Sequence, residues 1–287
     1  MRVHKAPEGL EATPLPRYLR RAYPMLPEQM LRRALKQRDV RINGSRAGEG
    51  GVVRGGDELK IYIDDKYLFQ RVRAVYEDER LLAVVKPVGL PVDVDAQMVG
   101  EDTLIRRIRT QWPGENFEPR LCHRLDAGTG GLVLAARDQE MYEAMLALFR
   151  EHRIEKIYQC LVRGCPKPPE AERKAYCIKD SRAARVKVVD GPQPGALTMV
   201  TRYRLMERMG PVSRMEVQLV TGRTHQIRAH MAHIGYPLLG DDKYGDRAFN
   251  QQMRAKNPYL WCARMTLPQD GLEARYRGMS FESAPEF

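Results

Sequence analysis

The sequence predicts an α+β fold: a larger domain with a mixed sheet of mostly antiparallel strands, preceded by a small α+β domain at the N-terminus. Three observations predict it. Predicted strands outnumber predicted helices, and most follow one another closely enough for antiparallel pairing. The helical segments do not alternate regularly with the strands, as they do in a parallel α/β sheet. Finally, positive charge gathers in the first quarter of the chain, which sets that part apart.

The composition is that of a folded protein. The chain has 287 residues, of which 43% are apolar and 30% are charged, so disordered and collagen-like classes are excluded. No stretch approaches the roughly 20 consecutive apolar residues of a membrane helix. Residues 1–16 contain no apolar segment typical of a secretory signal. The five cysteines form no CxxC pair, so we expect no disulfide framework, no zinc finger and a reducing, cytoplasmic location.

The net charge of +11 indicates polyanions among the partners of this protein. Residues 1–72 contain 15 Lys and Arg against 9 Asp and Glu, a net of +6. A quarter of the chain therefore carries more than half of the excess charge, and a charged surface that is merely solvated is the alternative explanation.

The small domain is predicted element by element. Residues 1–16 are rich in Pro and Gly, and we expect a flexible lead-in. Pro27 suits the first turn of a helix with apolar residues on one face and several arginines elsewhere. Residues 40–42 alternate like a strand, and Asn43 followed by Gly44 is a strong hairpin signal. A further turn and strand fall within residues 52–63.

The larger domain is predicted as strands with three helices. Residues 166–195 contain Pro-Lys-Pro-Pro and Pro-Gln-Pro-Gly, which indicate a long exposed excursion. Asp138 suits the N-cap of the second helix, and Pro237 follows the third. The predicted elements are a hairpin (74–76 and 81–85), a turn (86–89), helices (103–112, 138–150 and 225–233) and strands (132–134, 156–162, 199–205 and 214–219).

Several familiar catalytic signatures are missing from the sequence. There is no phosphate loop ending in Lys-Ser/Thr, no dinucleotide fingerprint, no GxSxG elbow and no HExxH. His225, His230 and His233 lie close together, but their spacings of five and three do not match a zinc pair on one helix face. We expect no metal site, and interpret these histidines as polar helix residues or nucleic-acid contacts.

Residues 121–134 form the densest polar signal. Asp126 lies between Arg124 and a glycine-rich turn that leads into an apolar strand. Small residues there allow a backbone or a flat ligand to approach closely. In an extended segment, Arg124 shares a face with Asp126 and keeps its carboxylate ionised. From the residues alone, a helix N-cap or a loop ion pair is the commoner explanation of such an aspartate.

Two other segments carry chemistry-bearing side chains. Residues 221–230 contain two arginines, a glutamine and two histidines, which suit recognition of phosphates or carboxylates. The alternative is a basic helix start that only caps the fold. Tyr158, in the predicted strand 156–162, is by itself most often a core aromatic with a solvated hydroxyl.

Taken in order, these segments resemble the ribosomal-large-subunit type of RNA pseudouridine synthase. The order and spacing hold from about residue 74 to the C-terminus, which implies a catalytic domain over 74–287. One departure is Gly130, where that family usually has serine. The matching blocks are 76–90, 123–126 with 129–132, 156–158 with Gly164, and 221–228 with 240–241 and 244–245.

The small domain, residues 17–70, resembles the RNA-binding domain shared with ribosomal protein S-four. The similarity lies in residues 38–44 and 56–59, whereas residues 27–30 replace the serine-arginine-serine step that usually begins the helix of that domain. The resemblance implies that this domain holds RNA by its backbone and shape without choosing the uridine. The residues implied in RNA binding are Arg32, Arg33, Lys36, Arg38 and Arg41.

The resemblance also implies the reaction and its residues. Uracil is detached from the ribose, turned and rejoined through carbon 5, without a metal or other cofactor. Asp126 would be the catalytic carboxylate, as a nucleophile or as the stabiliser of an oxocarbenium-like centre, and which bond it forms stays open. Arg223 would pair with this aspartate. Tyr158 would stack on the uracil and help to remove the carbon-5 proton. Arg124 would fill the gap left by the flipped nucleotide, and Leu219, His225, Gln226 and Arg228 would bind the substrate. Leu219 and Ile227 would line the uracil pocket, with packing in the core as the alternative for both.

The expected partner is RNA, in particular ribosomal RNA of the large subunit, with transfer RNA as an alternative substrate. We expect a monomer. Two readings from other classes compete: a catalytically silent RNA-binding or ribosome-assembly factor, and a metal-dependent RNA hydrolase. The intact Asp126, Tyr158 and Arg223 disfavour the first, and the lack of clustered carboxylates disfavours the second.

Overall fold

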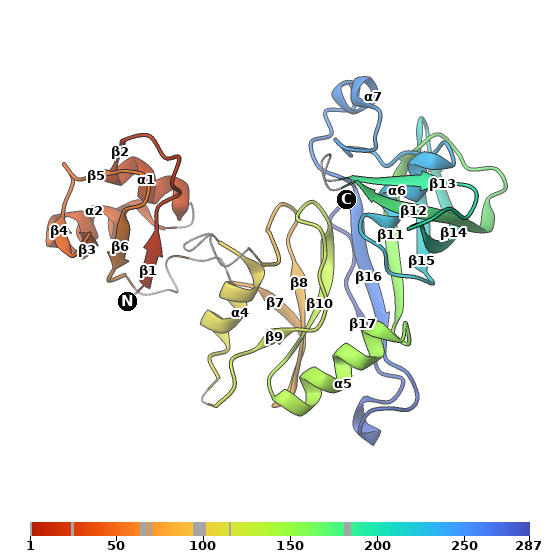
Figure 1. Cartoon of the computed structure of the whole chain (residues 1–287), viewed down its shortest axis with the longest axis horizontal. Coiled ribbons are helices and arrows are strands. Elements are labelled where there is room, and N and C mark those ends of the chain that lie inside the picture. Colours follow the sequence, from red (N-terminus) through yellow and green to blue (C-terminus); the bar gives the residue numbers. More distant parts are fainter. Residues whose placement is uncertain are drawn as a thin grey trace. The chain divides into compact units, whose positions relative to one another are not determined.

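The computed structural model describes residues 2–23, 26–63, 68, 71–93, 102–114, 116–180 and 185–287. It divides the chain into two compact units (Figure 1). The first unit comprises Met1–Val72 and Leu90–Pro119, and the second comprises Arg73–Gly89 and Arg120–Phe287. The sequence predicts one continuous domain over 74–287, but the segment Leu90–Pro119 groups with the N-terminal unit instead.

The first unit, as far as its residues are described, combines short strands with the helices α1, α2 and α4. Its four-stranded sheet has the order β1-β6-β3-β4, and β2 pairs with β5. The predicted hairpin is confirmed: Ile42 lies opposite Ser45, and the turn residues Asn43 and Gly44 have positive φ angles of 50° and 82°. The elements are β1 (Arg2–Lys5), β2 (Thr13–Pro14), α1 (Leu15–Ala22), α2 (Glu28–Gln37), β3 (Val40–Ile42), β4 (Ser45–Ala47), β5 (Val52–Val53), β6 (Glu58–Ile61) and α4 (Leu104–Gln111).

The N-terminal residues correct one prediction. Residues 1–16 are not a flexible lead-in, because β1 pairs with β6 over its whole length. His4 in this strand is buried, and its ring nitrogens contact the hydroxyls of Tyr23 and Tyr18 at 2.7 and 3.0 Å. The prolines and glycines of this segment mark the connections between β1, β2 and α1. The composition of this segment is typical of a loop, but β1 forms a strand because it pairs with β6, which is distant in sequence.

The second unit is built on one large sheet, ordered β13-β12-β14-β15-β11-β16-β10-β8-β7, with β17 beside β16 and β9 beside β10. In the described part of the chain its only parallel pair is β10 with β16, so the predicted α+β class with a mostly antiparallel mixed sheet is confirmed. The elements are β7 (Arg73–Glu77), β8 (Leu81–Lys86), β9 (Arg120–Leu121), β10 (Gly130–Ala136), α5 (Gln139–Arg150), β11 (Glu155–Arg163), β12 (Glu170–Asp180), β13 (Arg185–Val189), β14 (Leu197–Met209), β15 (Val212–Leu219), α6 (Gln226–His233), α7 (Arg247–Gln252), β16 (Leu260–Thr266), η1 (Ala274–Tyr276) and β17 (Ser280–Glu282).

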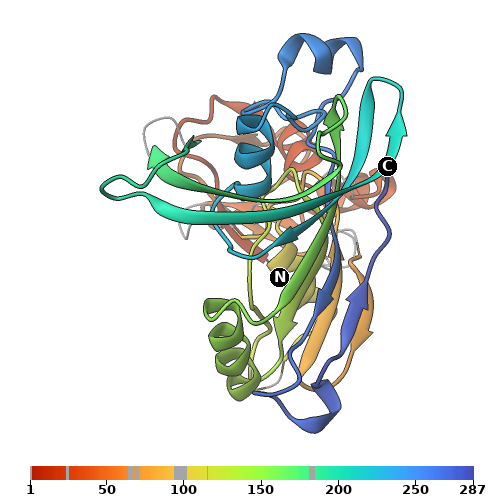
Figure 2. The same ribbon diagram turned by 90° about the vertical axis from the view of Figure 1, so that its right-hand side faces the viewer.

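The core of this unit lies along its central strands. Every residue of β8 and β10 is buried, which explains why both read as continuous apolar runs. The sheet twists strongly, so that β12 and β14 run across the direction of β10 and β16 (Figure 2). Asp138 caps α5 as predicted, since its carboxylate accepts a hydrogen bond from the backbone N–H of Met141 at 2.8 Å. No helix among the described residues is long and apolar enough to cross a membrane.

Residues 166–195 correct a second prediction. The expected exposed excursion is largely a pair of strands, β12 and β13, which extend the edge of the sheet. The proline-rich tetrapeptides flank these strands and do not interrupt them. Ala175 and Cys177 of β12 are buried on one face with a period of two, which the charged residues on either side of this pair obscure.

Gly130 begins β10 in the tightest part of the sheet. An added Cβ would lie 2.3 Å from Cζ3 of Trp261, which faces Gly130 in the parallel pair. Trp261 is fully buried, and its indole N–H donates to the carbonyl of Ser283 at 3.0 Å. The indole thus occupies the space that a serine side chain would need, which accounts for the departure from the usual family residue.

We expect Gly130→Ala to destabilise the protein by about 2 kcal/mol, because a methyl group there overpacks a core that cannot easily shift. Thermal unfolding monitored by circular dichroism measures this loss. Gly191→Ala is the matched control, since a Cβ at Gly191 meets nothing within 4 Å. Adding Trp261→Leu to Gly130→Ala should cost less than the sum of the two single changes. Equal melting temperatures for the two alanine variants would contradict the steric argument.

Candidate active site

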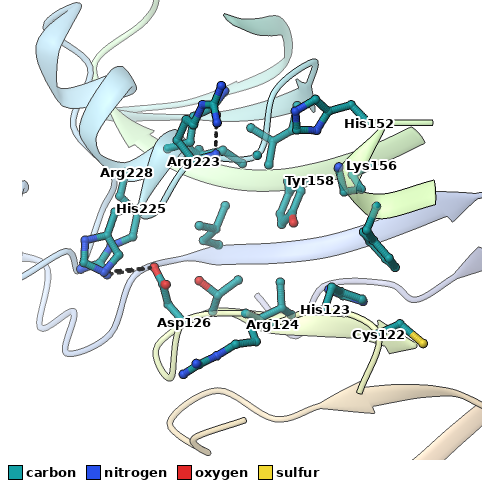
Figure 3. A pocket seen from close by; sticks show the side chains of 18 of the residues that line it. Cys122, His123, Arg124, Asp126, His152, Lys156, Tyr158, Arg223, His225 and Arg228 are labelled. Atoms are coloured by element: carbon teal, nitrogen blue, oxygen red, sulfur yellow. Dashed lines mark hydrogen bonds and ion pairs between the residues drawn. The ribbon is translucent and has the colours of Figure 1, made fainter. Parts of the chain in front are cut away.

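One cavity of the second unit brings the predicted catalytic and substrate-binding residues together. Its volume is about 470 Å³, within the usual range of roughly 300–1,000 Å³ for small-ligand sites. The wall is formed by the loop before β10, by α5 and β11, and by the segment from the end of β15 into α6 (Figure 3). All eight residues predicted for catalysis or substrate binding line it: Arg124, Asp126, Tyr158, Leu219, Arg223, His225, Gln226 and Arg228.

The loop that carries Asp126 is fixed from behind. The carbonyl of Ala127 accepts two hydrogen bonds, from the backbone N–H of Gly89 at 2.8 Å and from Nζ of Lys86 at 2.9 Å. Lys86 is fully buried, and burial lowers its pKa to about 7. The motif at residues 86–89 therefore holds the loop of Asp126, a role that the sequence did not reveal because lysine is rarely buried.

The side chain of Asp126 is held in place yet remains accessible. Its Oδ2 lies 3.2 Å from Nη1 of Arg228 and 3.8 Å from Nε2 of His225 (Figure 3). About a third of the side chain is exposed in the cavity. This carboxylate can thus keep a fixed orientation and still meet a bound molecule.

Arg228 links Asp126 to a second, buried carboxylate. Its Nε and Nη2 donate to the two oxygens of Asp241 at 2.7 and 2.9 Å, a bidentate pair. Burial alone would raise the pKa of Asp241, but the bonds and charge of Arg228 outweigh burial and lower it. Asp241 also accepts the backbone N–H groups of Lys243 and Tyr244. The sequence signal for this role of Asp241 was an acidic residue at the end of a buried stretch. A buried carboxylate needs a cationic partner.

The prediction that Arg223 pairs with Asp126 is wrong in this structure. Nε of Arg223 donates to the carbonyl of Thr198 in β14 at 3.0 Å. Arg228, five residues later, makes the pair instead, because α6 directs it toward the loop of Asp126 while Arg223 precedes the helix. Both arginines belong to one motif, so the sequence could not decide between them.

Gln226 is a structural residue rather than a free substrate contact. Its Oε1 accepts from the hydroxyl of Thr221 and the backbone N–H of Arg223, at 2.8 and 2.9 Å. Its Nε2 donates to the carbonyl of Val200 and the hydroxyl of Thr201, at 2.9 and 3.1 Å. The amide is therefore fully engaged within the protein and ties the start of α6 to β14.

Tyr158 forms a buried part of the cavity wall on β11. Burial raises the pKa of its hydroxyl well above the ordinary value, and a hydrogen bond with Cys262 adds to this effect. The hydroxyl thus stays protonated, which disfavours a phenolate base and leaves the ring as a surface for stacking. Leu219 is half-buried and Ile227 buried beside it, while Arg124 is exposed.

The three clustered histidines serve different partners. Nδ1 of His225 lies 2.9 Å from the hydroxyl of Tyr244, His230 contacts the hydroxyl of Thr201, and His233 contacts Asp190. Burial lowers the pKa of His225, although the charge of Asp126 opposes this effect. No group of three His, Cys, Asp or Glu among the described residues is arranged to hold a metal ion.

His230 should make the fold sensitive to acid. It is buried, and burial lowers its pKa from 6.5 to about 4. At pH values between these two pKa values, His230 is protonated in the unfolded chain and neutral in the folded chain. The free energy of unfolding therefore falls as the pH drops, by up to roughly 3 kcal/mol. Urea unfolding at about pH 7 and about pH 4.5 measures the loss. His230→Gln keeps a hydrogen-bonding group for Thr201 and should shrink the loss, and an unchanged loss would contradict this origin.

The predicted RNA-binding residues lie in the first unit, on and after α2. Arg32, Arg33, Lys36 and Arg38 are exposed, and Arg41 is half-buried with its guanidinium 5.5 Å from the ring centre of Tyr62. Burial of the opposite face of α2 follows the predicted apolar period. One face of this helix is thus a surface of exposed cations.

Comparison with known proteins decides what these features belong to. A family model described as RNA pseudouridylate synthase matches residues 80–233, more than half of the chain and most of the cavity wall. The chain belongs to the RNA pseudouridylate synthase family. It is an RNA pseudouridine synthase, an isomerase that acts on RNA.

Named relatives agree with this assignment. The synthase is 30% identical to ribosomal large subunit pseudouridine synthase C of Escherichia coli strain K12, over 82% of this chain and 77% of that one. The same-named protein of Rickettsia bellii is 30% identical, over 82% and 83%. An uncharacterized RNA pseudouridine synthase of Chloroflexus aurantiacus is 34% identical, over 94% and 87%. The solved structure of human RNA pseudouridylate synthase domain containing 1 is similar with a TM-score of 0.63 and 25% identity, over 76% and 84%.

Proposed function

We propose that this synthase isomerises specific uridines of large-subunit ribosomal RNA, with Asp126 as the catalytic carboxylate. Relatives named as ribosomal large subunit synthases support the substrate, since they align over more than three quarters of both chains. The observation that carries the catalytic assignment is geometric. Asp126 is the only carboxylate among the described residues that line the cavity, and it is held by Arg228 while remaining accessible.

Asp126 would act on the sugar of the bound uridine. The bond between N1 of uracil and carbon 1′ of the ribose breaks, and carbon 5 forms the new bond to carbon 1′. Carbon 5 gives up its proton and N1 takes up a proton, so the net change is an isomerisation without a co-reactant. An ionised carboxylate can support the positive charge that develops on the ribose as the first bond breaks. Arg228, anchored by Asp241, would keep the carboxylate aimed at this point. Arg228 is therefore proposed as a positioning residue.

Tyr158 would hold the uracil by stacking while it turns. A base reaches a cavity of this kind only when it leaves its stack, at a cost of a few kcal/mol. The aromatic ring of Tyr158 and the apolar side chains of Leu219 and Ile227 can offset part of that cost. Arg124, exposed at the cavity, would fill the place of the flipped nucleotide.

The first unit would supply affinity for RNA. The exposed cations of α2 suit contacts to phosphates, which position RNA without reading its sequence. We place the RNA-binding domain at residues 17–70, and propose a monomer that works in the cytoplasm, where its five free cysteines stay reduced.

Pseudouridine mapping tests the substrate. Total RNA from cells with and without the gene is treated with carbodiimide and sequenced. Loss of one or a few sites in large-subunit ribosomal RNA is the expected result. Loss confined to transfer RNA would overturn the substrate and retain the chemistry. If no site is lost, purified protein is assayed on large-subunit ribosomal RNA transcribed in vitro, which contains no pseudouridine, and a lack of product there would contradict the proposed function.

A further inference from the structure

The side chains that line the cavity include more positive than negative charges. Arg228 is paired with Asp126 and Asp241. On the side of the cavity across from Asp126, Figure 3 shows His152 and Lys156, with Arg223 above Tyr158. We call His152, Lys156 and Arg223 the cationic wall.

Lys156 is the most unusual member of the cationic wall. Only 6% of the residue is exposed, and burial lowers its pKa. No carboxylate contacts it among the described residues, and its ammonium instead lies 5.8 Å from the ring centre of Phe149. A buried lysine without an anionic partner is costly for the folded protein. An anion in the cavity would remove that cost.

Of the other two members, Arg223 adds a second permanent positive charge to the region and His152 adds a titratable imidazole. Arg223 uses Nε to hold the carbonyl of Thr198, and none of the described carboxylates forms an ion pair with its guanidinium. His152 follows α5 with a positive φ of 57°, next to the cavity. Partial burial and then the charges of Lys156 and Arg223 lower the pKa of His152, so the three groups lie within electrostatic reach of one another. A lysine and an arginine that both lack an ion pair among the described residues bring no structural benefit to this wall.

We propose that the cationic wall binds a backbone phosphate of the RNA next to the target uridine, a proposal that rests on the proposed function. Phosphate oxygens accept charge-assisted hydrogen bonds from ammonium and guanidinium groups. Lys156 and Tyr158 lie two positions apart on β11, so they share one face at a separation of about 7 Å. That separation suits a nucleotide with its phosphate on Lys156 and its base against Tyr158. This proposal gives Arg223 a role in binding RNA, although it does not pair with Asp126.

Salt-dependent binding tests this proposal with a defined probe. Fluorescein-labelled dodecauridylate is titrated with the full chain at about 50, 100 and 200 mM KCl, and anisotropy gives Kd. Each phosphate contact to a single strand contributes about 0.7 to the slope of log Kd against log salt concentration. We expect Lys156→Gln and Arg223→Gln each to lower that slope, by up to about 0.7 because both groups share one phosphate, and to weaken binding several-fold. Lys156→Met serves as a second variant if Lys156→Gln does not fold by circular dichroism.

Arg208→Gln is the matched control, because Arg208 is an exposed arginine of β14 that does not line the cavity. Its slope should equal that of the unaltered chain. The proposal is overturned if the slope stays unchanged in the cavity variants, if Arg208→Gln lowers it equally, or if the oligouridylate does not bind. Binding is measured without chemistry, so a lack of pseudouridine formation by the unaltered chain would count against the proposed function alone.

Discussion

Asp126→Asn is expected to abolish pseudouridine formation while leaving RNA binding intact. The amide has nearly the same shape but no charge, so it cannot support positive charge on the ribose. We expect the rate to fall by at least about 10⁴-fold, as when a catalytic side chain is removed from other enzymes. Tritium release from RNA labelled at carbon 5 of uridine measures the rate under single-turnover conditions.

The binding of RNA by Asp126→Asn separates catalysis from affinity. Loss of a negative charge from a cavity that receives a polyanion should leave Kd unchanged or lower it. A variant that still forms pseudouridine at a comparable rate would disprove the role of Asp126. Equal loss of binding and rate would instead point to a damaged fold, which thermal unfolding would reveal.

Arg228→Lys is expected to lower kcat by about 10²-fold, because lysine keeps the charge but cannot bridge Asp126 and Asp241 with one planar group. Arg228→Gln should also cost stability, by about 3–5 kcal/mol, since Asp241 would keep a buried charge without its partner. Tritium release gives kcat and KM, and thermal unfolding gives the loss of stability.

Comparison of the two arginines tests the assignment made by the structure. The fold-decrease in kcat caused by Arg223→Lys should be at least about ten times smaller than that caused by Arg228→Lys, because Arg223 does not contact Asp126. Arg208→Lys controls for loss of an exposed arginine. A larger fall in kcat for Arg223→Lys would reverse the assignment and restore the prediction made from the sequence.

The sequence identified the chemistry of the site because reactive residues recur in short motifs. Asp126, Tyr158 and the segment 221–228 could be named as one set, and Asp126, Tyr158 and most of that segment line one cavity. Local patterns likewise located α2, the hairpin at Asn43 and Gly44, and the N-cap of α5. In each of these cases the residues that determine the structure lie close together in the sequence, so a short segment is enough to predict it.

Only the tertiary structure decided which groups meet across the fold. The choice of Arg228 over Arg223, the buried partner Asp241 and the support of the Asp126 loop by Lys86 all depend on side chains brought together from distant segments. The same holds for β1 and for β12 with β13, whose loop-like composition is overridden by pairing with other strands. The sequence by itself determined the family, the fold class and the reactive residue types. The partners of each residue followed from packing, because hydrogen bonds and burial depend on distance in space and not on separation along the chain.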